Sequence, residues 1–422
     1  MRDFAPALRV AEFRRWWLAL LAMGIGMQML EVAIGWEVYA LHRSPLDLGW
    51  IGLAEFIPMF VLALPAGHLA DRLPRRLVFG AALTLGACVG SGLAAVSASG
   101  QTSVVPYLAL AAGSGTVMAL GTPAARAMAP TLVPASVLPN AMSLRTVAVQ
   151  TGQVLGPALG GVLYAASPVL VYLLAAGMCL VAAVLVVSVR SRAHADAAGQ
   201  TEAGRPEPLG RARMLAGVRL VRQTPIILGA ILLDLLAVLF GGAVALLPVF
   251  ARSILHVGPA GLGALRAAPA VGALVAAVMI TRWPIGRRAG RTLLTMVGVY
   301  GIAIIVFGLS RFFLLSLIAL AVSGFADLFS VNIRITTVAL ATPDRLRGRV
   351  SAVEMVFISA SNQLGAFESG LAAFLVGTVP AVIGGGVITV LIAMSWRRFF
   401  PDLARVDGFQ DVAPAAGAPA EG

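Results

Sequence analysis

The chain carries about a dozen apolar segments of roughly 20 residues each, separated by short polar connections. Residues 81–98, 104–120 and 169–189 contain no charged side chain at all. A helix that rises about 1.5 Å per residue needs roughly 20 apolar residues to cross the hydrocarbon core of a bilayer. Soluble domains do not repeat such segments, because they would expose too much apolar surface to water. The pattern therefore predicts an all-α, polytopic membrane protein.

The segments divide into twelve expected spans and leave no room in the 422 residues for a soluble catalytic domain. The expected spans cover residues 16–41, 48–70, 77–98, 104–127, 139–166, 168–189, 225–251, 258–281, 290–310, 312–340, 349–375 and 377–397.

The net charge of +12 could suggest a nucleic-acid partner, but the position of the charges argues against it. All 31 basic residues are arginines, and most lie in alternate connections and at the two termini. Only Arg43, Arg252 and Arg311 fall in the opposite set of loops. This asymmetry follows the positive-inside rule, so we expect both termini in the cytoplasm and no nucleic-acid partner.

One connection is long, polar and rich in Ala, Gly and Pro, as in a flexible linker. It divides the chain into two sets of six spans, and a weak internal repeat supports the same boundary. At an offset of 209 residues, Gly156 matches Gly365 and Gly161 matches Gly370. Such repeats are typical of transporters whose substrate site lies between two pseudo-symmetric halves. The expected organisation is a cytoplasmic segment 1–15, a six-helix half 16–189, a cytoplasmic linker 190–224, a second half 225–398 and a disordered tail 399–422.

A polar motif stands between the second and third expected spans: Gly67-His68-Leu69-Ala70-Asp71-Arg72-Leu73-Pro74-Arg75-Arg76. It resembles the signature loop of the major facilitator superfamily, and the resemblance implies that superfamily's fold of two six-helix halves. In that superfamily the Asp and Arg belong to a cytoplasmic latch between the halves. The resemblance therefore implies this role for Asp71, Arg72 and Arg76, and Gly67 permits close helix contact. The alternative is a basic loop that only sets orientation. The corresponding loop 281–288 lacks the aspartate.

Further motifs narrow the resemblance to the branch that contains the enterobactin exporter, macrolide efflux proteins and the lysophospholipid transporter. They are Phe13-Arg14-Arg15-Trp16-Trp17, Ser44-Pro45-Leu46-Asp47-Leu48-Gly49, Ala125–Pro134, Gly156–Gly161 and Thr342–Val350. In the superfamily, a glycine-proline element like Gly156-Pro157, with Gly160 and Gly161, accompanies exporters. A packing kink without directional meaning is the competing interpretation.

Ionisable groups inside the spans are costly and are therefore functional candidates. We single out seven as coupling or cargo residues: Glu31, Glu55, Asp234, Arg266, Asp327, Arg126 and Arg334. A carboxylic acid buried without a partner favours its neutral form and can carry a proton across, whereas one paired with an arginine stays charged. Arg126 and Arg334, at equivalent repeat positions, either bind anionic cargo or only set topology, and the second interpretation is favoured.

Depth estimates suggest which charged groups meet. Glu31, Asp234 and Arg266 fall near the midplane, so Asp234 with Arg266 is the first ion pair to test. Asp327 and Arg334 are seven residues apart, two turns along one helix face, so no direct contact is expected between them. Glu37 and Glu354 are expected to be boundary groups that reach water.

The function expected from these features is proton-coupled export of an amphipathic, siderophore- or macrolide-like small molecule by alternating access. The alternatives are a lysophospholipid translocator of the same fold and a transport-dead membrane sensor. No histidine or cysteine spacing suits a metal, and neither a nucleotide loop nor a nucleophile elbow occurs, so no enzyme activity, metal or cofactor is expected. The expected location is the bacterial cytoplasmic membrane, where we expect the chain to act as a monomer, as most superfamily members do.

Overall fold

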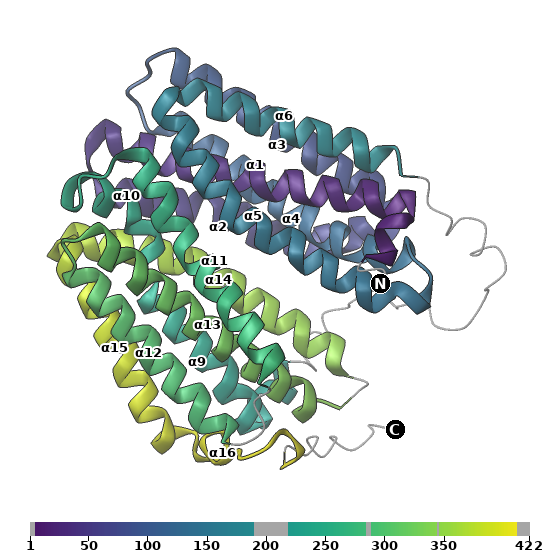
Figure 1. Cartoon of the computed structure of the whole chain (residues 1–422), viewed down its shortest axis with the longest axis vertical. Coiled ribbons are helices and arrows are strands. Elements are labelled where there is room, and N and C mark those ends of the chain that lie inside the picture. Colours follow the sequence, from purple (N-terminus) through teal and green to yellow (C-terminus); the bar gives the residue numbers. More distant parts are fainter. Residues whose placement is uncertain (1–4, 190–217, 284–287, 344–345, 412–422) are drawn as a thin grey trace. The chain divides into compact units, whose positions relative to one another are not determined.

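The computed structural model describes residues 5–189, 218–283, 288–343 and 346–411, except the side chains of 63–64, 66–72, 349, 352, 355–356, 359 and 411. Helices account for nearly all of these residues, because in a bilayer a helix satisfies its own backbone hydrogen bonds (Figure 1). The long helices are α1 (Ala11–His42), α2 (Pro45–Arg72), α3 (Arg75–Ala98), α4 (Val105–Met128), α5 (Leu138–Ala166), α6 (Pro168–Val187), α9 (Pro225–Gly241), α11 (Gly258–Arg282), α12 (Ala289–Leu309), α13 (Phe313–Ala341), α14 (Arg347–Val376) and α15 (Thr378–Phe399).

Among the described residues, ten helices are long and apolar enough to cross a membrane, counting Pro225–Ile254 as one. The other two long helices, α5 and α14, contain 29 and 30 residues and carry more polar side chains. Together they make up the twelve expected spans.

The seventh expected span is not one continuous helix, which corrects the prediction of an unbroken span over 225–251. α9 ends at Gly241, and a 3-10 turn η4 (Ala243–Leu246), a short α10 (Leu247–Val249) and a π-helical turn η5 (Phe250–Ile254) follow. The break falls at Gly241-Gly242, where Gly242 has φ −73° and ψ 61°, outside the helical region. Two consecutive glycines lower helix propensity, and the apolar pattern alone could not show this break.

The chain forms two compact units. Unit 1 comprises Met1–Pro208 and Pro248–Ala267, and unit 2 comprises Leu209–Leu247 and Ala268–Gly422. Most of the linker expected at 190–224 lies outside the described residues. The start of the tail that we expected to be disordered contains a short helix, α16 (Pro401–Arg405), whose Leu403 is buried.

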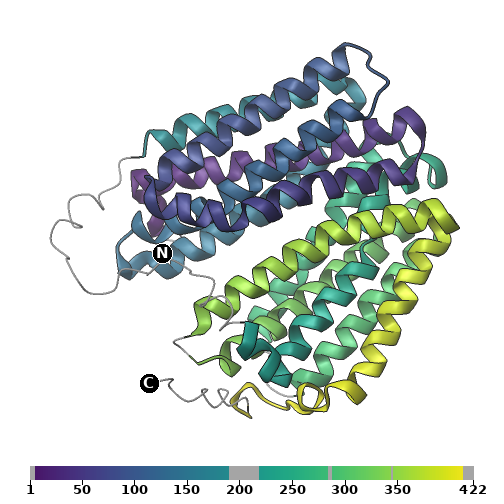
Figure 2. The same ribbon diagram turned by 180° about the vertical axis from the view of Figure 1, so that it is seen from behind.

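The two units repeat the same helix pairings. In unit 1, α1 packs against α5 and α6, and α3 packs against α4 and α6; in unit 2, α9 packs against α14 and α15, and α12 against α13 and α15 (Figures 1 and 2). Gly156 of α5 meets the backbone of Ile25 on α1, and its repeat partner Gly365 on α14 meets the backbone of Val238 and Leu239 on α9. The internal repeat is therefore also a repeat of packing.

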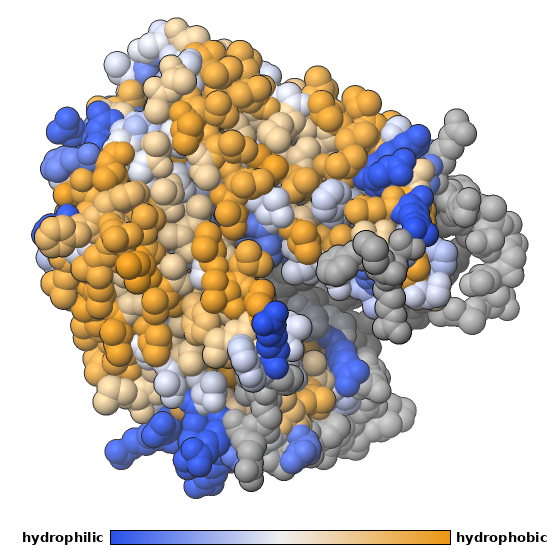
Figure 3. Space-filling model, in the orientation of Figure 1, coloured by the Kyte–Doolittle hydropathy of each residue, from blue (hydrophilic) through white to orange (hydrophobic). Residues whose placement is uncertain are grey.

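The outward faces of the helices are apolar. Leu173, Leu180 and Val184 on α6 are 52%, 53% and 64% exposed. Figure 3 shows the same character over much of one face, with hydrophilic side chains gathered near helix ends. Such surfaces suit contact with lipid chains.

Candidate functional site

In unit 1, an ion pair joins α1 to the part of α11 that belongs to the same unit. The Arg266 guanidinium contacts the Glu31 carboxylate directly, and the two side chains are 18% and 36% exposed. Asp234 and Arg266 belong to different units, and each has another partner within its own unit: Arg334 for Asp234 and Glu31 for Arg266. Position along a helix does not determine which helices are neighbours, so the partner of Arg266 could not be inferred from the sequence.

Two amides on α1 and α5, the helices that carry Glu31 and the glycines packed against it, were missed by the sequence analysis. Gln28 lies one turn before Glu31 on α1, and its Cβ faces Gly156 of α5. Gln153 of α5 is exposed at the middle of its helix, as is Asn362, which occupies the equivalent repeat position on α14. An amide facing lipid at this depth would lack hydrogen-bond partners. An uncharged polar residue inside an apolar span is the sequence signal that identifies both glutamines as candidates.

Close packing of α5 on α1 depends on glycines spaced by four residues. Gly152 faces Gly24, Gly156 faces Ile25 and Gln28, and Gly160 faces Met29. On the neighbouring side of α5, the Pro157 carbonyl and Gly161 approach Gly263 of α11 within unit 1. This arrangement fits close backbone approach between membrane helices.

Replacing Gly156 by valine is expected to destabilise unit 1. A Cβ at position 156 would lie 2.5 Å from the Gln28 Cβ and 2.9 Å from the Ile25 carbonyl oxygen. Overpacking of this kind costs about 1–3 kcal/mol. Thermal melting of the purified protein measures the change. Gly177→Val is the matched control, because a Cβ at Gly177 meets nothing within 4 Å. Equal melting of both variants would contradict the packing role.

Glu37 does not behave as the boundary group that we expected. Its carboxylate accepts hydrogen bonds from the hydroxyls of Tyr107, at 2.9 Å, and Tyr172, at 2.5 Å. Both tyrosines are buried, so Glu37 ties α1 to α4 and α6. The sequence contains these tyrosines, but their distance along the chain conceals the contact.

In unit 2, a buried charge cluster joins α9, α13 and α14. The Arg334 guanidinium lies 2.6 Å from the Glu354 carboxylate and 3.3 Å from that of Asp234. Arg334 is 2% exposed, and both acids are 8% exposed. Two expectations fail here: Glu354 does not reach water, and Arg334 is not a topogenic surface charge. Burial with two acids requires the arginine to stay charged and fixes its position between three helices.

Asp327 adds a third carboxylate on α13. It is close enough to interact electrostatically with Asp234 and Arg334, yet it makes no hydrogen bond or ion pair with any residue that the structure describes. The absence of direct contact with Arg334 agrees with their two-turn separation. Within the described part of unit 2, the cluster therefore holds three carboxylates and one guanidinium, an excess of acid that protons can neutralise.

The remaining candidates lie on α2, α3 and α4. Gly67, Asp71 and Arg72 belong to the last turns of α2, but their side chains lie outside the described residues, so the latch stays a prediction. The Arg76 guanidinium donates to the Val189 carbonyl at 3.0 Å, at the end of α6. Glu55 is half-buried on α2, and Arg126 is exposed near the end of α4.

The fold and the match to a family model define a class of protein: a multi-pass membrane transporter of the major facilitator superfamily, which is not an enzyme. A bacterial homologue of the human lysosomal transporter Spinster, in an inward-facing and unoccupied conformation, matches with TM-score 0.73 and 15% identity, covering 96% of this chain and 99% of the other. A D-xylose–proton symporter matches with TM-score 0.69 and 14% identity, covering 93% and 99%. At these identities the likeness concerns the fold.

Within the superfamily, the chain belongs to the transmembrane secretion effector family, whose model matches residues 1–411. Its relatives include the enterobactin exporter EntS of Citrobacter koseri, 29% identical over 398 residues that cover 92% of this chain and 93% of the relative. The EntS protein of Shigella boydii is 27% identical over the same shares. As a superfamily member, the chain carries small-molecule substrates.

Proposed function

We propose that this transporter exports an amphipathic small molecule, siderophore- or macrolide-like, in exchange for protons. Support for export comes from the relatives, which are named as exporters of enterobactin, and from the description of the family as secretion effectors. The proposed setting is the bacterial cytoplasmic membrane, with both termini in the cytoplasm, a monomeric chain and the Asp71 loop as an inner latch.

The observation that carries the proton coupling is the excess of acid in unit 2. The single positive charge of Arg334 lies between the carboxylates of Asp234 and Glu354 and can balance only one of them. Asp327 has no ion-pair or hydrogen-bond partner among the described residues. A carboxylic acid in a low-dielectric environment favours its neutral form and changes state when hydration or neighbouring charge changes. Asp327, with Asp234 beside it, therefore takes up a proton in one conformation and releases it in another.

Polar groups in unit 1 support this cargo chemistry. Glu31 and Arg266 offer a negative and a positive group, and Gln28 and Gln153 offer amide donors and acceptors. The surrounding side chains are apolar. Such a surface suits a molecule with several hydrogen-bonding groups on a large apolar body.

A comparison of cells with and without this chain tests the proposed function. Small molecules inside and outside the cells are measured under iron limitation and in rich medium. We expect a secreted metabolite to accumulate inside cells that lack the chain, and Glu31→Gln to reproduce the defect. If extracellular levels stay equal and lysophospholipid uptake falls, the translocator replaces the exporter. No difference in either quantity would contradict both transport functions.

A further inference from the structure

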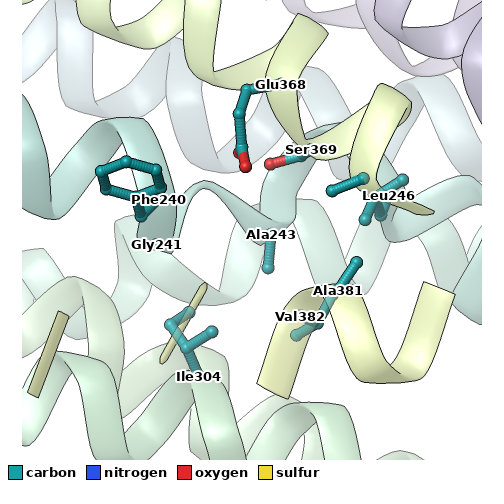
Figure 4. A pocket seen from close by; sticks show the side chains of 10 residues that line it. Phe240, Gly241, Ala243, Leu246, Ile304, Glu368, Ser369, Ala381 and Val382 are labelled. Carbon is teal, nitrogen blue, oxygen red and sulfur yellow. The ribbon is translucent and has the colours of Figure 1, made fainter. Parts of the chain in front are cut away.

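Unit 2 contains a small hollow beside the break after α9. It has room for a group of about the size of one water molecule and is lined mainly by apolar side chains, including Phe240, Ile304 and Val382. Glu368 of α14 is the ionisable residue among those that line it. Figure 4 shows the oxygen atoms of Glu368 and Ser369 next to each other, above the bend from Gly241 to Ala243.

No positively charged side chain in the described parts of the chain pairs with the Glu368 carboxylate. The residue is half-buried, and it forms no ion pair with any residue in the described parts of the chain. An ionised carboxylate in such a mainly apolar place is costly unless a positive charge accompanies it. The hollow therefore favours either a proton on Glu368 or a bound cation.

The broken helix adds further oxygen atoms. α9 ends at Gly241, so the carbonyls of its last turn lack partners within the helix, and the negative end of its dipole lies here. The bend is held in place: Tyr300 donates to the Gly241 carbonyl at 2.9 Å, and Ser369 donates to the Gly242 carbonyl at 3.2 Å. Each carbonyl retains a second lone pair.

We propose that this hollow binds an alkali cation of sodium size through the Glu368 carboxylate, the Ser369 hydroxyl and the carbonyls of Gly241 and Gly242. All four donors are oxygen, which hard cations prefer. One carboxylate matches a single positive charge, so a divalent ion would remain uncompensated. Unwound segments of transporter helices commonly coordinate ions with their backbone carbonyls. The proposed ligands are not members of the Arg334 cluster, and the cation stabilises the bend after α9 whether or not protons drive transport.

Thermal melting of the purified full chain tests the site without any cargo. The protein is melted in sodium chloride, in potassium chloride and in choline chloride at equal ionic strength. Ligand binding to the folded state raises the melting temperature, so we expect sodium to raise it by about 2 °C or more over choline, and potassium to raise it less. Glu368→Gln should abolish the sodium shift, and Ser369→Ala should reduce it.

Two matched controls identify the site. Ser361→Ala removes another α14 hydroxyl, one that bonds the carbonyl of Ile358 in its own helix, and Asp402→Asn removes a carboxylate on α16. Both should keep the full sodium shift. No sodium shift in the wild type, a shift of equal size in potassium, or a shift that survives Glu368→Gln would each overturn the site. None of these three outcomes contradicts proton-driven export, which we propose for other residues.

Discussion

Replacing Arg334 by methionine is expected to lower the free energy of unfolding by about 3–5 kcal/mol, the cost of breaking a buried ion pair from one side. The change leaves Asp234 and Glu354, each 8% exposed, without the guanidinium that lies 3.3 and 2.6 Å from them. Methionine retains much of the side-chain volume, so the loss is mainly one of charge. Thermal melting of the purified protein should show a fall of roughly 10 °C, or too little folded protein to measure.

Removing the acids together with the arginine separates charge from packing. The triple variant Arg334→Met, Asp234→Asn, Glu354→Gln should recover most of the lost stability, because the two acids that the guanidinium contacts are then neutral. Arg291→Met, at an exposed position on α12, is the control and should melt like the wild type. Wild-type melting of the Arg334→Met protein would show that the cluster does not hold α9, α13 and α14 together.

The sequence predicted the helices well because bilayer thickness imposes a strong and simple length requirement. For an apolar segment of this length, the α-helix is the structure that satisfies all backbone hydrogen bonds within lipid. The sequence did not predict the break at Gly241-Gly242, because the residues on both sides of it are as apolar as those of a continuous span. Hydropathy reports burial in the membrane and contains no information about backbone continuity.

The contacts between charged groups were harder to predict, since they depend on which helices are neighbours and how each is rotated. The repeat relates Arg334 to Arg126 within one residue, yet their surroundings differ. At an offset of 209 residues, Asp234 corresponds to Ile25 and Glu354 corresponds to Arg145. The two units therefore share a packing pattern but not a charge pattern. Among the described residues the buried acidic cluster belongs to unit 2, and it could not be inferred from the repeat.

Replacing Asp327 by asparagine is expected to abolish proton-driven transport while the protein remains folded. Asparagine has nearly the same shape, and among the described residues the carboxylate has no ion pair or hydrogen bond whose loss would destabilise α13. The variant cannot take up and release a proton at this position, so the proton gradient should no longer drive movement of the cargo. The expected loss of driven rate is about tenfold or more, which corresponds to roughly 1.4 kcal/mol or more. Asp402→Asn, outside the spanning helices, should transport normally.

Proton-coupled export is tested most directly in liposomes that contain the purified protein and enclose the metabolite identified in the cell comparison. An acidic exterior drives protons inward, and efflux of the metabolite is followed together with the internal pH. Wild-type protein should release the metabolite about tenfold faster with the gradient than without it, and acidify the interior as it does so. Asp327→Asn should release it at one slow rate in both conditions. Two results would contradict proton-coupled export through Asp327: a wild-type efflux rate that is the same with and without the proton gradient, or gradient-driven efflux that persists in Asp327→Asn.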